Sequence, residues 1–247
     1  SALLTQKKKT DPLWIGSVPT RVMPGDTRSQ HTVYHFLLPD SGMSDYKDKV
    51  IRDMAKPEIE TIKNWRRDFT RPFAKGEIKQ LEKLSAAVDK LWDTHTMLQR
   101  SIRDRTTDPL IVFGQPEPEN KQPLTSTGAK DRVLNQELLS QNVRASSHYR
   151  RLKLAMDYWC ALWFWPIEKA ALLPSREEFL LEITLILEGN LYDASQSKGV
   201  QLPLFPDTRP RQMALEMVDA FGFVDIDKLC RDNQRLHLVC CLTEKYR

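Results

Sequence analysis

Residues 149–166, YRRLKLAMDYWCALWFWP, constrain the fold more than any other stretch because they contain three of the six tryptophans. Their apolar positions recur at the spacing of an α-helix and form two neighbouring faces. A helix that is apolar over most of its circumference is normally buried. We therefore expect a mainly α-helical protein with this segment as its central helix. The first face comprises Leu152, Met156, Trp159 and Trp163, and the second comprises Leu154, Tyr158, Ala161 and Trp165.

Two interpretations of these aromatic side chains are open. In the first, Trp159 and Trp163 fill the core, where large aromatic residues at helical spacing usually lie. In the second, they form an exposed platform on which nucleic-acid bases stack. We favour the core, because only a narrow strip with Lys153 and Asp157, an i,i+4 pair, gives the helix a polar side.

Prolines and glycines divide the chain into four predicted segments. Residues 1–43 form an extended N-terminal segment, in which TVYHFLLP at 32–39 predicts a short strand. Residues 44–105 form a helical hairpin, and 106–129 form a proline-rich linker or long loop. Residues 130–247 form a helical bundle around the Trp-rich helix.

The predicted hairpin contains the most regular helical pattern in the chain. Its apolar spacings alternate between three and four residues, which is typical of a heptad seam that needs a partner. We favour pairing with the preceding helical segment; the alternative is a coiled-coil interface between copies of the chain. The seam runs through Leu81, Leu84, Val88, Leu91, His95, Leu98 and Ile102.

Local signals place the starts of two helices. Pro57 suits the first turn of a helix, where its missing N–H is not needed, so a helix is expected to begin there. Ser175 and Glu178 form a capping-box pattern ahead of the apolar run FLLEITLIL at 179–187. A second helix is therefore expected to start after Ser175.

Composition narrows the class of protein. Hydrophobic residues at 40% and charged residues at 28% are typical of a globular protein. No apolar run reaches the roughly 20 residues that a membrane-spanning helix needs. The N-terminal lysines follow the short apolar group instead of preceding it, which is the wrong order for a secretion signal. We expect a cytoplasmic protein with reduced thiols at Cys160, Cys230, Cys240 and Cys241.

Motifs for chemistry are missing from the sequence. It contains no glycine-rich phosphate loop, no paired-histidine metal motif and no nucleophile elbow. The cysteines lack the spacing of a metal site. We therefore predict no catalytic residue, no metal site and no cofactor for this chain, and whether it belongs to an enzyme stays uncertain.

Two basic clusters are the best candidates for contacts with nucleic acid, since the net charge is only +4. The first lies in ten residues without a carboxylate, and the second flanks Trp65. A solvated helix surface is the alternative for both. The candidate DNA-binding residues are Arg144, Arg150, Arg151 and Lys153 in the first cluster, and Lys63, Arg66 and Arg67 in the second.

Four strings in the chain resemble the long helical region of large adenine-specific DNA methyltransferases. These strings are HFLLPDSGM at 35–43, KNWRRDF at 63–69, DYWCALWFWP at 157–166 and RLHLVCCLTEKYR at 235–247. The family serves restriction–modification and phage defence and includes fused restriction–methylation enzymes. In it, a stretch like EKYR at 244–247 precedes a catalytic strand and an Asn-Pro-Pro-aromatic motif that holds the flipped adenine.

The resemblance implies a non-catalytic segment of such an enzyme. Neither the Asn-Pro-Pro-aromatic motif nor the glycine-rich S-adenosylmethionine motif occurs here, so no catalytic residue is carried over. S-adenosylmethionine would be the cofactor of the parent protein. The expected partners are duplex DNA and the remaining domains of that methyltransferase, without a membrane. The alternative is a helical protein-interaction module with no nucleic-acid role, and an independent enzyme ranks last.

Overall fold

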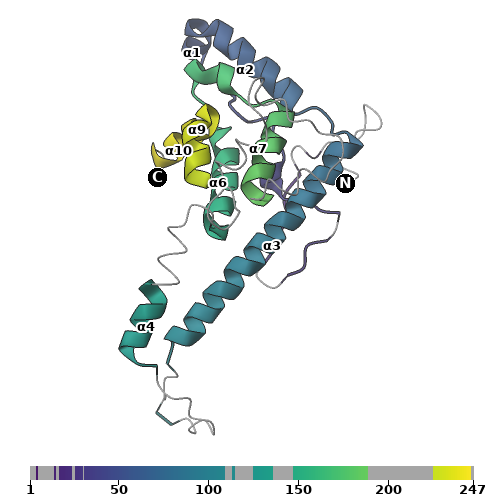
Figure 1. The fold of residues 1–247 in the computed structure, drawn as a ribbon. Helices are drawn as coiled ribbons and strands as arrows, with labels where there is room; N and C mark the ends of the chain where they lie inside the picture. The colour runs from purple at the N-terminus through teal and green to yellow at the C-terminus, as the bar shows by residue number, and fades with distance from the viewer. Residues whose placement is uncertain are drawn as a thin grey trace, which may run out of the picture.

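The protein is an assembly of helices in the computed structural model (Figure 1). Within the part of the chain that the structure describes, the backbone forms helices, turns and irregular segments but no β-strand. The mainly α-helical fold predicted from the sequence is therefore confirmed. The structure describes residues 4, 14, 17–23, 26–29, 31–108, 113–114, 125–135, 147–188 and 225–245.

The predicted strand at 32–39 is wrong, because its centre is the 3-10 helix η2, His35–Leu37. The amide of Leu37 donates to the carbonyl of Tyr34 at 3.0 Å, a bond between residues three apart. Phe36 and Leu37 are both buried although they are adjacent. A strand would place adjacent side chains on opposite faces, whereas a tight turn can direct both into one core.

Two α-helices precede the longest of the described helices. Helix α1, Lys49–Met54, is capped by the Asp48 side chain, which accepts from the amide of Ile51 at 3.0 Å. Helix α2, Lys56–Phe69, carries Pro57 in its first turn, as predicted. It packs against the 3-10 helix η4, Ile167–Leu172.

Helix α3, Lys75–Thr106, contains the heptad seam and packs against α6, His148–Ala161, and α7, Arg176–Glu188. The seam thus faces later helices and not mainly α2, which the hairpin prediction proposed as its partner; His95 and Leu98 of the seam are only partly buried. The last residue that α3 gives to the common core is Leu91. Beyond it, α3 continues away from the core, with α4, Thr127–Val133, alongside (Figure 1). Helix α4 begins inside the segment predicted as a linker.

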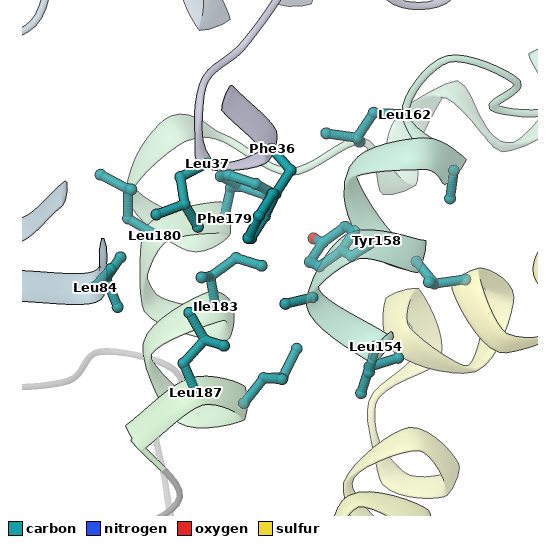
Figure 2. Packing of buried hydrophobic residues seen from close by; sticks show 14 of the residues in the cluster. Phe36, Leu37, Leu84, Leu154, Tyr158, Leu162, Phe179, Leu180, Ile183 and Leu187 are labelled. Atoms are coloured by element: carbon teal, nitrogen blue, oxygen red, sulfur yellow. The ribbon is translucent and has the colours of Figure 1, made fainter. Parts of the chain in front are cut away.

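Helix α6 is central, because α3, α7, η2 and α10, Gln234–Lys245, all pack against it (Figure 1). The second predicted face of the Trp-rich segment is buried throughout, from Leu154 to Trp165. Figure 2 shows Tyr158 facing Phe179 of α7, and their ring centroids are 5.2 Å apart. The first face is less deeply placed than predicted: Trp159 and Trp163 are partly buried against the core, and Met156 is exposed.

The C-terminal helices complete the core. The predicted capping box begins α7, since the Ser175 amide donates to Glu178 at 2.8 Å and the Glu178 amide donates to the Ser175 hydroxyl at 3.2 Å. Helix α9, Ile226–Asp232, packs against α10, which covers α6. One hydrophobic cluster joins residues from the predicted hairpin and the predicted bundle. The domain boundaries remain predictions.

Candidate nucleic-acid interface

Arg150 is held in an ion pair that crosses from α6 to α9. Its guanidinium donates to both carboxylate oxygens of Asp227, and the longer of the two contacts is 3.0 Å. This hydrogen bond raises the pKa of Arg150. A two-pronged pair of this kind fixes the side chain and uses much of its capacity to bind a phosphate. Arg144, from the same predicted cluster, lies outside the described residues.

Arg151 does not belong to an exposed DNA-binding face, because only 4% of its surface is accessible. Its guanidinium donates to the carbonyl of Ile186 at 2.9 Å and to that of Leu187. These carbonyls belong to the last turn of α7, where the helix has no N–H partners for them. Burial lowers the pKa of Arg151 to about 10. The side chain therefore caps α7 from inside the protein.

Lys153 forms the predicted i,i+4 ion pair with Asp157 on the same helix. Both side chains are about three-quarters covered. Within the described part of the first cluster, each cation thus interacts with a carboxylate or with main-chain carbonyls.

Of the three cations in the second cluster, one is directed toward the protein and two are directed toward solvent. Arg66 lies 3.0 Å from Asp45 and donates to the carbonyl of Met43 at 3.3 Å. Lys63 and Arg67 leave 67% and 72% of their side chains exposed. They are one turn apart on α2, so they lie on the same side of that helix. Their ion pairs, with Glu60 and Asp68, are both 3.4 Å long. Lys63 and Arg67 are the predicted residues best placed for a phosphate backbone.

A buried polar network, which the sequence reasoning missed, connects three helices. Glu182 of α7 is only 2% exposed and accepts hydrogen bonds from the hydroxyl of Tyr158, the amide of Asn233 and the guanidinium of Arg235. Arg235 also donates to Glu178 at 3.1 Å. Burial and the adjacent carboxylate raise the pKa of Tyr158. The signal in the sequence was an acidic residue inside the apolar run 179–187.

The loop at 38–44 is fixed against the turn that follows α6. The indole of Trp159 donates to the carbonyl of Leu38 at 2.8 Å, and the Ser44 hydroxyl donates to the carbonyl of Leu162 at 2.8 Å. At Gly42 there is no space for a side chain, because a Cβ would lie 2.8 Å from the Trp163 ring. The loop and the turn therefore form one close-packed unit.

Two further properties bear on function. None of the described helices combines the length and the apolar character needed to cross a membrane. Among the described residues, no three His, Cys, Asp or Glu side chains gather in the way a metal ion would require.

Comparison of the chain with protein-family models, curated proteins and solved structures gives no match. The resemblance to adenine-specific DNA methyltransferases therefore stays a prediction based on the four strings.

Proposed function

We propose that this chain is a non-catalytic helical segment of an adenine-specific DNA methyltransferase of the restriction–modification or phage-defence type. It supports the catalytic core of a cytoplasmic enzyme that uses S-adenosylmethionine. It also contacts the DNA backbone through Lys63 and Arg67 on α2. The reaction itself belongs to other parts of that enzyme.

The observation that carries the proposal is that the four strings of the resemblance meet in one place. Trp159, from the third string, donates to Leu38 in the first. Arg66, from the second string, donates to Met43, also in the first. Helix α10, which holds most of the fourth string, packs on α6. Strings that are dispersed in sequence but packed together in space are expected when the shared feature is a supporting framework, not a set of separate surface contacts.

The exposed pair on α2 supports the DNA-binding part of the proposal. Exposed ion pairs are typically worth about 0–1 kcal/mol, so Glu60 and Asp68 are weak competitors for the two cations. A phosphate can therefore replace them. Contacts to phosphates position a protein on DNA without specifying a sequence.

The test is the salt dependence of binding to a duplex of arbitrary sequence. Two phosphate contacts give a slope of log affinity against log salt of about −2, and Lys63→Ala with Arg67→Ala should flatten it by about that amount. The matched control is Lys79→Ala with Lys90→Ala, which removes the same charge from exposed positions on α3. Equal slopes for the two double variants would contradict a specific role for α2.

A separate check addresses the proposed family. If the parent gene encodes an Asn-Pro-Pro-aromatic motif soon after Arg247, the methyltransferase assignment gains direct support. An unrelated sequence there would contradict it.

One observation favours the alternative, a protein-interaction module. Beyond the core, α3 exposes 45% of Trp92 and 69% of Met97. Large exposed apolar side chains on a projecting helix suit a protein partner. If the unmodified chain shows no DNA binding even at low salt, this alternative replaces the DNA-binding role.

A further inference from the structure

Two of the four cysteines lie in direct contact across the α9–α10 joint. The Sγ atoms of Cys230 in α9 and Cys240 in α10 are 3.1 Å apart and form a thiol–thiol hydrogen bond. Cys230 is 8% exposed, and Cys240 is partly covered. Both are free thiols. The contact joins side chains ten residues apart, so it depends on the folded arrangement of the two helices.

The other two cysteines have different surroundings. Cys160 and Cys241 are exposed, and the Sγ of Cys241 lies 3.6 Å from Nε2 of His237. Cys241 is adjacent to Cys240 in the sequence but does not share its contact with Cys230. Successive residues on an α-helix point about 100° apart, which separates these neighbours.

The two sulfur atoms of the contact differ in burial, and charged side chains lie near both of them. Cys240 donates the hydrogen bond to Cys230, and this contact together with burial raises the pKa of Cys230. The Arg150–Asp227 ion pair lies near both thiols, and Asp157 and Glu244 act on Cys240. Because Cys240 is the less buried of the two thiols, it is the sulfur that a peroxide reaches first.

We propose that Cys230 and Cys240 are a site of reversible oxidative modification, in which a peroxide converts the two thiols into an intramolecular disulfide. The Cys240 thiolate attacks a peroxide oxygen, the O–O bond breaks, and hydroxide leaves as water to give a sulfenic acid. The Cys230 sulfur then attacks this sulfur, the S–S bond forms, and a second water leaves with the Cys230 proton. The two thiols lose two electrons and hydrogen peroxide gains them.

Formation of this disulfide requires little rearrangement of the two cysteine side chains. A disulfide has an S–S length of about 2.05 Å, so the sulfur atoms need to approach by about 1 Å. Small rotations of two side chains can supply that movement. The bond would tie α9 to α10, while Arg150 already ties α9 to α6. Oxidation is therefore expected to fix the C-terminal helices against the central helix.

The test treats the reduced, purified chain with hydrogen peroxide, alkylates the remaining thiols and maps tryptic peptides by mass spectrometry without reduction. The expected product links the peptide of Cys230 to the peptide of Cys240, weighs two hydrogen atoms less than the sum, and separates with dithiothreitol. Cys240 and Cys241 share a tryptic peptide. The Cys241→Ser variant therefore assigns the bond, because it should keep the linked product.

Peroxide is expected to raise the thermal midpoint of the unmodified chain, because the new bond ties α9 to α10. Cys240→Ser is expected to abolish both the link and this rise. Three results would overturn the proposal: a bond between Cys240 and Cys241, disulfide-linked dimers through Cys160 or Cys241, or four alkylatable thiols after peroxide. Each can be read from the unmodified chain and Cys241→Ser, so the test does not depend on Cys240→Ser being folded.

Discussion

Adjacent arginines on α6 have opposite roles that only the fold distinguishes. Arg151 caps the end of α7 from the interior, whereas Arg150 lies in a partly exposed ion pair with Asp227. Arg151→Ala leaves buried carbonyls without donors, so we expect it to lower the free energy of unfolding by about 1–3 kcal/mol. Urea denaturation measures the loss.

Arg150→Ala is the matched control for this prediction. It removes the same side chain one residue away, and its partner Asp227 can turn to water. The loss should be smaller than for Arg151→Ala. Equal losses would show that burial does not decide the roles of the two residues. The sequence supplies the basic composition of the cluster, but the rotation of α6 about its axis, which separates these neighbours, depends on long-range packing.

At the scale of the helix, the Trp-rich segment shows how much of a helix the spacing of its apolar residues can predict. Its spacing correctly predicts a central helix with a buried face through Tyr158 and Trp165. It does not show that α6 ends at Ala161, after which Trp163 lies in a turn and Trp165 in the irregular segment that follows. The loop at 38–44 covers the first face only in part, and no local pattern in the sequence indicates that contact.

This arrangement predicts an order among the tryptophans. Trp165 is fully buried, so Trp165→Ala should cost about 3–5 kcal/mol of stability. Trp159→Ala should cost less, because Trp159 is only partly buried; the variant loses the hydrogen bond to Leu38 and the ring contacts with His35 and Trp163. Urea midpoints of the two variants give the comparison. A larger loss of stability for Trp159→Ala than for Trp165→Ala would indicate that the first face, and not the second, lies at the centre of the core.

Across the whole molecule, the features that could be predicted are those that depend on residues close in sequence. The capping box at Ser175 and the proline at the start of α2 depend on residues close in sequence, and both were predictable. The partner of the α3 seam depends on residues that follow much later in the chain, and it was not. The same holds for the candidate site. The charges of its residues can be read from the sequence, but the fold determines that the Lys63 side chain is exposed and that of Arg66 is largely covered.

The network around Glu182 joins three helices, α6, α7 and α10. Arg235→Ala would leave the Glu182 carboxylate buried without its cation, and breaking one side of such a pair costs about 3–5 kcal/mol. Glu182→Gln keeps the shape and removes the charge. In the double variant the uncompensated charge is gone, so its loss of stability should be clearly smaller than the sum of the two single losses. Urea denaturation of the three variants and the unmodified chain measures this coupling. Additive losses would mean that Glu182 and Arg235 act independently, and that their contact does not couple α10 to α7.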